Sequence, residues 1–155
     1  MLVRSATAAD VPAVLPMVAA ICALHEGLDP ERYAMLPDVV ARYERWLPQR
    51  ATDPRSVFLV AEHEGRVIGF LVASIERNIP IYRLDEYAFI HDTWVEPGHR
   101  RRGVARELVR EAVERFRALG VRQVRLETAG ENEPARRLFA SCGFRAGTID
   151  MLRSL

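Results

Sequence analysis

The chain has 155 residues, of which 49% are hydrophobic, so it is long enough to bury a sizeable core within one domain. Its 22 basic and 21 acidic residues nearly cancel and leave a formal net charge of +1. This balance excludes the strong overall field on which nonspecific binding to nucleic acid or to an anionic membrane depends. We therefore expect a single domain over residues 1–155, with no nucleic-acid partner and no membrane partner.

The N-terminal residues show no targeting signal. The stretch MLVRSATAADVP lacks the charged region and following apolar region of a secretory signal peptide. No stretch approaches the ~20 apolar residues of a membrane span. Cys22 and Cys142 fall in predicted helices, where free cysteines pack as small apolar residues, so we expect no disulfide. These features predict a cytoplasmic protein.

The first part of the chain predicts a short strand followed by two helices. Residues 1–5 read as a strand, and Thr7 followed by Asp10 resembles a capping box that begins a helix. Apolar residues then recur at helical spacing, at Val11, Val14, Leu15, Val18, Ile21 and Cys22. Residues 25–38 are rich in turn-forming residues, and a second helix is expected over residues 39–47.

The middle of the chain predicts three strands and a third helix. Residues 57–75 contain two apolar, β-branched runs around HEGR, which is typical of a hairpin. Another strand is expected over residues 87–95. From Gly103 the apolar residues recur at helical spacing, and Gly120 supplies a stop signal for this helix.

The C-terminal part predicts a strand, a short helix and one or two final strands. Residues 121–128 alternate with a period of two. Asn132 can cap a helix that ends at Gly143, and residues 144–155 are expected to add the last strand or strands. The complete order of elements is that of a mixed α/β protein.

The stretch EPGHRRRGVA, residues 96–105, carries the clearest chemical signal. It joins a predicted strand to a predicted helix, and a helix N-terminus offers unpaired N–H groups and partial positive charge to an anion. Gly103 and Ala105 leave the backbone accessible, and the three arginines add charge and forked donors, although a solvated basic surface would look similar. The P-loop pattern and the G-x-G-x-x-G pattern are both absent, which indicates a phosphate ligand of another kind.

Two spaced motifs resemble those of the GCN5-related N-acetyltransferase (GNAT) family. The family's coenzyme A motif, [RQ]-x-x-G-x-[GA], is matched by Arg100, Gly103 and Ala105. A later motif, N-x-x-A-x-x-[LF]-[YF]-x-x-x-G-F, is matched over residues 132–144. The resemblance covers about residues 87–145, whereas the N-terminal half agrees only in its order of elements.

The resemblance implies an α/β (α+β) fold. Its centre would be a mixed, mostly antiparallel sheet of six to seven strands, flanked by four helices and splayed between the fourth and fifth strands, here residues 87–95 and 121–128. The family uses acetyl-CoA as a co-substrate and needs no metal.

The resemblance also assigns contacts with acetyl-CoA. The pantetheine arm would pair with the strand backbone at Thr93, Trp94 and Val95, and an amide near Val95 would stabilise the oxyanion. The diphosphate would rest on the backbone amides of Arg101, Arg102, Gly103, Val104, Ala105 and Arg106. Further positions implied to contact the cofactor are Arg100, Asn132, Arg136 and Phe139. Asn132 can equally be a plain helix cap, and Arg136 can belong to an exposed helical face.

Acetyl transfer to an amine requires a base, because an alkylammonium group with a pKa near ~10.4 has no lone pair to offer. Strand alternation predicts that Asp92 and Trp94 share one face of the sheet while His91 lies on the other. We favour Asp92 as the base or as the group that holds a water. His91 has a suitable unperturbed pKa but can also be a packing residue, and Glu127 is either a third candidate or a surface ion-pair partner.

Phe139 departs from the family pattern. Many relatives place a tyrosine here that protonates the departing thiolate, and Cys142, Tyr82, Tyr87 or a water could replace it. A thiolate whose conjugate acid has a pKa near ~8.5 is also a tolerable leaving group by itself. The departure therefore does not exclude catalysis.

These features imply an N-acetyltransferase that moves an acetyl group from acetyl-CoA to a primary amine of a small molecule or peptide, by direct attack in a ternary complex. Acidic residues in the stretches 25–38 and 76–86 favour a cationic acceptor. The alternative is a noncatalytic module that binds or senses acyl-CoA. A nucleic-acid-binding role would rest only on residues 100–102. Family members often pair through the sheet edge, which leaves a homodimer open.

Overall fold

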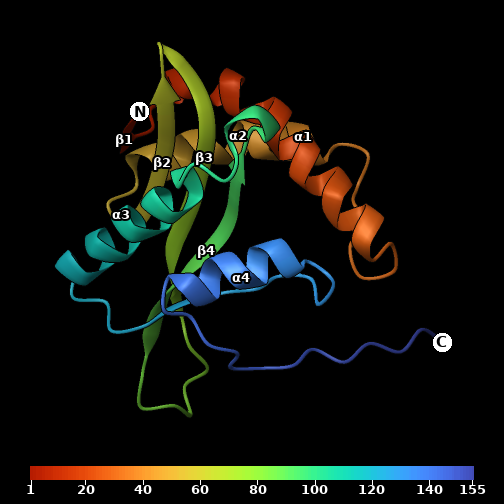
Figure 1. The fold of residues 1–155 in the computed structure, drawn as a ribbon. Coiled ribbons are helices and arrows are strands. Elements are labelled where there is room, and N and C mark those ends of the chain that lie inside the picture. Colours follow the sequence, from red (N-terminus) through yellow and green to blue (C-terminus); the bar gives the residue numbers. More distant parts are fainter.

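Five strands form one open sheet in the computed structural model, which describes all 155 residues (Figure 1). The strands are β1 (Leu2–Ser5), β2 (Ser56–His63), β3 (Arg66–Arg77), β4 (Glu86–Val95) and β5 (Val124–Leu126). The helices are α1 (Val11–Leu28), α2 (Val39–Thr52), α3 (Val104–Ala118) and α4 (Glu133–Ser141), with short 3-10 turns at Ala8–Asp10 and Pro97–His99. The mixed α/β character predicted from the sequence is confirmed.

The strands lie in the order β1-β2-β3-β4-β5. The first four pair antiparallel, whereas β5 runs parallel to β4. The β2–β3 connection is the predicted hairpin, and its two turn residues, Glu64 and Gly65, have φ angles of 51° and 73°. Two central residues with positive φ match the right-handed twist of the paired strands.

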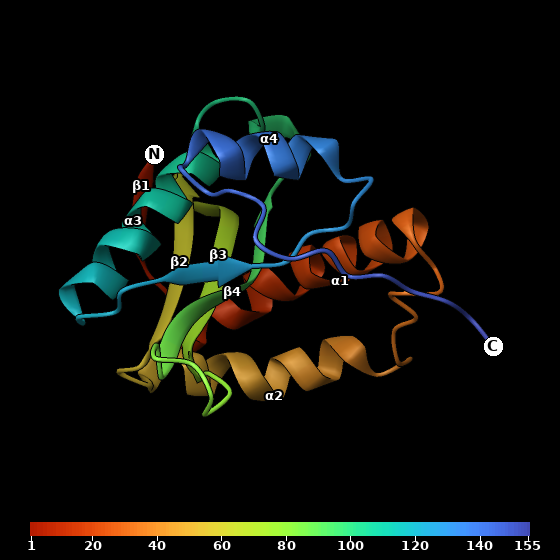
Figure 2. The same cartoon turned by 90° about the horizontal axis from the view of Figure 1, so that it is seen from below.

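Each face of the sheet is covered by two helices. Helices α1 and α2 lie against one face, and α3 and α4 against the other (Figure 2). Successive residues of β2 show this division, because Val57 and Leu59 pack with α3 while Phe58 and Val60 pack with α1. Strand alternation therefore supplies both cores from the same three central strands.

The open edge of β4 is the feature of the fold that positions the site. Strand β5 pairs with β4 only at Ala88, Phe89 and Ile90. The second half of β4, up to Val95, has no strand on that side. The sheet therefore separates between β4 and β5, as expected, and leaves unpaired strand backbone close to the start of α3.

The structure has five strands rather than six to seven. Strand β5 is limited to three residues, and residues 144–155 form no strand. Phe144 packs against the core, but the side chains of Ile149 and Met151 remain 85% and 89% exposed, so the tail beyond Phe144 buries no apolar face against the sheet. A strand is fixed in register when one of its faces is buried, and no such burial fixes a register for these residues.

The N-terminal helix corrects a second expectation. The segment Ala8–Leu28 contains an 18-residue window with a mean hydropathy of 1.7 and is, by length and composition alone, long and apolar enough to cross a membrane. The expectation that no such stretch exists was wrong. In the structure this segment packs Val11, Val14 and Val18 against the sheet. Its capping box forms as predicted, with the Asp10 carboxylate accepting from the Thr7 backbone N–H at 2.8 Å.

Candidate active site

The turn before α3 presents a row of free backbone amides. Arg101 and Gly103 have φ angles of 59° and 83°, which turn the chain sharply ahead of Val104. The backbone N–H groups of residues 101 to 106 donate no hydrogen bond, and the first backbone amide of the helix with an acceptor is that of Glu107, bonded to the Gly103 carbonyl at 3.0 Å. Successive amides in such a turn, at a helix N-terminus, form a concave site for an anion.

Arg100 ties this turn to the end of β4. Its guanidinium lies 4.4 Å from the centre of the Trp94 ring, and its Nε donates to the Val95 carbonyl at 2.9 Å. Arg101 and Arg102 are exposed. The backbone of the turn therefore faces outward, while the first arginine holds it in place.

A bulge in β4 decides which backbone groups reach the open edge. Val72 of β3 pairs with Asp92 and the adjacent Ala73 pairs with Ile90, so His91 is an extra residue without a partner. Before the bulge the Ala88 N–H donates away from β3, to the carbonyl of Gln123 directly before β5. After it the Glu96 N–H donates towards β3, at the Ile68 carbonyl. By alternation, Thr93 and Val95 then present their backbone groups to the open side.

The same bulge places His91 and Asp92 on one face of the sheet. The Asp92 carboxylate accepts a hydrogen bond from the Tyr43 hydroxyl of α2 at 2.8 Å. The His91 ring lies edge-on to Trp46 of the same helix, with 5.2 Å between the ring centres. The prediction that the two residues occupy opposite faces was wrong, because one extra residue shifts the strict alternation of the strand.

Asp92 is a buried carboxyl group with one protein partner. Its side chain faces α1 and α2, and burial raises its pKa, while the hydrogen bond from Tyr43 opposes that rise. Burial also raises the pKa of the Tyr43 phenol, which therefore stays protonated and donates. Asp92 Oδ1 makes no hydrogen bond within the protein. One carboxylate oxygen is thus held by Tyr43, and the other is free to bond a ligand.

Tyr43 was missed in the sequence analysis. It lies on the inner face of α2, one turn after Val39 and one turn before Leu47, and all three contribute to the same core. That i, i+4, i+8 spacing could have marked it as inward-facing. Its contact with β4 could not have been found, because the two residues are separated by 49 positions.

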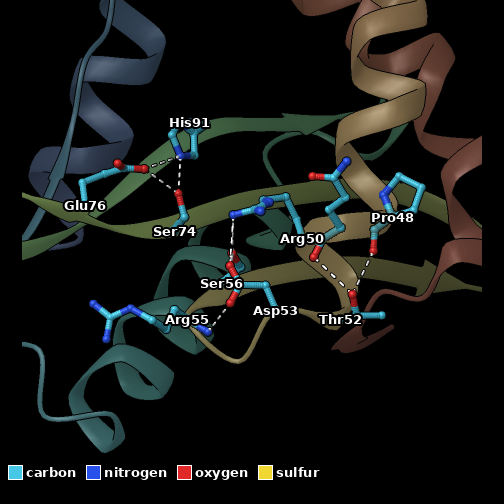
Figure 3. A network of polar contacts seen from close by, with 10 residues as sticks. Pro48, Arg50, Thr52, Asp53, Arg55, Ser56, Ser74, Glu76 and His91 are labelled. Atoms are coloured by element: carbon cyan, nitrogen blue, oxygen red, sulfur yellow. Dashed lines mark hydrogen bonds and ion pairs between the residues drawn. The ribbon is translucent and has the colours of Figure 1, made fainter.

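His91 is engaged by β3, as Figure 3 shows. Its Nε2 lies 2.6 Å from the Ser74 hydroxyl and 3.4 Å from Oε1 of Glu76. Since Ser74 donates its single proton to Glu76 at 2.7 Å, its oxygen must accept from Nε2, which is therefore the protonated nitrogen. Burial lowers the pKa of His91, and Glu76 opposes this shift. Nε2 of the imidazole is therefore bonded to β3, which lies on the opposite side of β4 from the open edge.

Comparison with known proteins shows the family of the chain. Residues 21–144 match the family model described as the acetyltransferase (GNAT) family. The chain belongs to the GNAT family. It is 32% identical over 108 residues to an uncharacterised N-acetyltransferase of Methanocaldococcus jannaschii, a match that covers 66% of this chain and 43% of that protein. It is 36% identical over 117 residues to a mycothiol acetyltransferase of Beutenbergia cavernae, covering 74% of this chain and 36% of the relative.

The solved structures agree with this assignment at the level of fold. The BH1408 protein of Bacillus halodurans superimposes with a TM-score of 0.85 at 19% sequence identity, and the match covers 100% of both chains. Several curated relatives are longer than this GNAT chain, which matches less than half of the archaeal protein and of the mycothiol enzyme.

Helix α4 carries the second GNAT motif. Asn132 caps it, with Oδ1 accepting from the Ala135 N–H at 3.3 Å, while exposed Arg136 donates to the Gly130 carbonyl at 3.2 Å. Phe139 is buried in the core under α3 and lies edge-on to Phe144, with 5.7 Å between the rings. The motif therefore builds and anchors the helix through Asn132 and Phe139.

The other candidate groups lie elsewhere on this GNAT chain. The Glu127 side chain is 74% exposed and pairs with Arg32 at 3.8 Å. Tyr82 is exposed in the loop after β3, and the Tyr87 ring lies 3.9 Å from the Arg125 guanidinium. Cys142 is half-buried and, like Cys22, forms no disulfide, as expected.

Proposed function

We propose that this chain is a cytoplasmic, acetyl-CoA-dependent N-acetyltransferase that acetylates a primary amine by direct attack in a ternary complex. One observation carries the proposal. The free amides of residues 101 to 106 lie next to the unpaired edge of β4, so an anion site adjoins a backbone edge. A diphosphate followed by an amide-bearing arm is a ligand that fits both.

The donor would extend from the turn along β4. Its diphosphate would take hydrogen bonds from the amides before α3, and its pantetheine arm would pair with the backbone at Thr93 to Val95. The Val95 N–H would then face the thioester carbonyl and stabilise the negative charge that develops on its oxygen. The Val95 carbonyl is already bonded to Arg100, which holds this end of the strand in place.

Asp92 is the proposed base. The acceptor ammonium would give a proton to the free carboxylate oxygen, and the resulting amine would attack the thioester carbon. His91 is less suited, because its Nε2 is bonded to Ser74. Glu127 is mostly exposed and paired with Arg32. Buried Phe139 offers no acid, so the thiolate would leave without help from that position.

The acceptor is proposed to be a small-molecule or peptide amine with positive charge. Glu26 in the last turn of α1, together with Asp29 and Glu31 directly after this helix, gives the region an acidic character. One of the matched relatives is named for the acetylation of mycothiol, which is a small molecule. A cationic amine would be drawn to these carboxylates before it loses a proton to Asp92.

Release of free thiol from acetyl-CoA tests the proposal. We would measure it with a panel of a polyamine, an aminoglycoside, an amino acid and a peptide, and identify products by mass spectrometry. Saturable, amine-dependent thiol release with a mass gain of one acetyl group is expected. Saturable binding of acetyl-CoA in a calorimeter with no turnover across the panel would instead support an acyl-CoA-binding module.

A further inference from the structure

The hydroxyl of Tyr43 is hydrogen-bonded to Asp92, which is the proposed base. We propose that Tyr43 is a positioning residue for acetyl transfer. Its hydroxyl holds Oδ2 of Asp92 at 2.8 Å and so leaves Oδ1 to receive the proton of the acceptor amine. This inference rests on the proposed function and adds to it a residue of α2 outside both GNAT motifs.

A purely structural role explains the pair poorly. Asp92 is 9% exposed and forms no ion pair with any cation, so its charged form is held only by the Tyr43 hydroxyl. Burying a carboxylate under such conditions costs free energy that one hydrogen bond offsets only in part. Apolar side chains at both positions would pack in the same core without that cost.

The surroundings fix the phenol ring and place no cationic side chain of the protein against Asp92. Trp46 lies edge-on to the Tyr43 ring, with 5.7 Å between their centres. Cys22 of α1 is the other titratable group packed near this carboxylate, and its thiol pKa is raised by burial first and by Asp92 next. Glu26 lies one turn further along α1, and the His91 imidazole on β4 is turned to Ser74. The tyrosine is therefore the hydrogen-bond donor that sets the state of the carboxylate.

The proton and electron balance assigns each oxygen a task. The ammonium gives one proton to Oδ1, and the amine lone pair forms the new C–N bond. The C–S bond breaks with its electron pair on sulfur, which takes the second nitrogen proton as it leaves as a thiol. Asp92 then returns its proton to solvent, while the Tyr43 hydroxyl keeps its proton throughout.

The pH profile of Tyr43→Phe tests the proposal. Removal of a donor to the carboxylate raises the pKa of Asp92, so the acid limb of kcat/KM should move to higher pH. We expect kcat at pH 7 to fall about tenfold, with partial recovery at higher pH and an unchanged KM for acetyl-CoA. Asp92→Asn should lower kcat more than 100-fold. The double variant Tyr43→Phe/Asp92→Asn should have nearly the same kcat as Asp92→Asn alone, because the two residues act as one unit.

Ser56→Ala is the matched control. The Ser56 hydroxyl donates to Asp53 at 2.9 Å, which is the same kind of hydroxyl-to-carboxylate bond at a different place (Figure 3). This variant should leave the acid limb where it is. A second measurement changes the strength of the hydrogen bond without removing the hydroxyl. Fluorotyrosine incorporated in place of tyrosine is a stronger hydrogen-bond donor. It should move the acid limb to lower pH in the wild type and leave it unmoved in Tyr43→Phe.

The outcomes separate the two proposals. Wild-type protein without turnover would overturn the proposed function, and the inference with it. Wild-type turnover with an acid limb that neither Tyr43→Phe nor fluorotyrosine moves would overturn only the role of Tyr43. Additive losses in the double variant would likewise make Tyr43 independent of Asp92.

Discussion

Substitution of Gly103 tests the anion site most directly. Its φ of 83° lies in the left-handed region, and a Cβ built there meets no atom within 4 Å. Gly103→Ala therefore introduces no steric clash, and its cost is backbone strain of about 1–2 kcal/mol. For a chain of this size that corresponds to a fall in Tm of roughly 2–8 °C. Acetyl-CoA affinity should fall only modestly.

Gly103→Glu adds a negative charge beside the free amides. At an effective dielectric constant of about 20, a unit charge about 6 Å away repels each phosphate charge by about 3 kcal/mol. We therefore expect Gly103→Glu to bind acetyl-CoA at least about 100-fold more weakly than Gly103→Ala. The difference should shrink as ionic strength rises, because salt screens exposed charges.

Gly65 offers a matched control, since it also has a positive φ, of 73°, and open space at its Cβ. Gly65→Ala and Gly65→Glu should lower Tm by similar amounts without changing the affinity for acetyl-CoA. Titration calorimetry gives the dissociation constants, and thermal denaturation gives the stability of all four variants. Equal affinities for Gly103→Glu and Gly103→Ala would refute the assignment of the diphosphate to this turn.

Three further substitutions probe the fold. In Gly69→Ala the new Cβ would lie 2.8 Å from the Trp94 carbonyl oxygen, so β4 must shift, and unfolding experiments should show a loss of about 1–3 kcal/mol together with reduced turnover. Arg4 lowers the pKa of Asp10 from 3.8 to about 2, so this pair stabilises the fold above pH 4 and loses its contribution as pH falls towards 2. Urea unfolding of Asp10→Asn should therefore show a loss of about 1–2 kcal/mol at pH 7 and almost none at pH 2. Phe139→Tyr would bury a hydroxyl in an apolar core, so thermal denaturation should show a lower Tm, equivalent to a loss of about 1–3 kcal/mol in the free energy of unfolding, with no gain in kcat.

Much of the fold could be predicted from local patterns. The capping box at Thr7, the hairpin turn at Gly65 and the helix cap at Asn132 each depend on residues within a few positions of one another. The anion site is local in the same sense. A positive φ at Gly103 and a helix that begins at Val104 are enough to leave a row of amides free. The periodicity and motifs of the sequence therefore predicted the elements up to α4, their order and the candidate phosphate site.

The geometry around Asp92 was decided only by tertiary structure. The bulge at His91 arises from the pairing of β4 with β3, and it turns two residues of one strand towards the same helices. Tyr43 meets Asp92 across 49 positions of sequence. The missing final strand has the same origin, because the residues after Phe144 find no apolar surface to cover. Local preferences specify turns and helix caps. The register of a strand, the face on which each side chain lies and the partners of buried polar groups depend instead on which distant segments pack against one another.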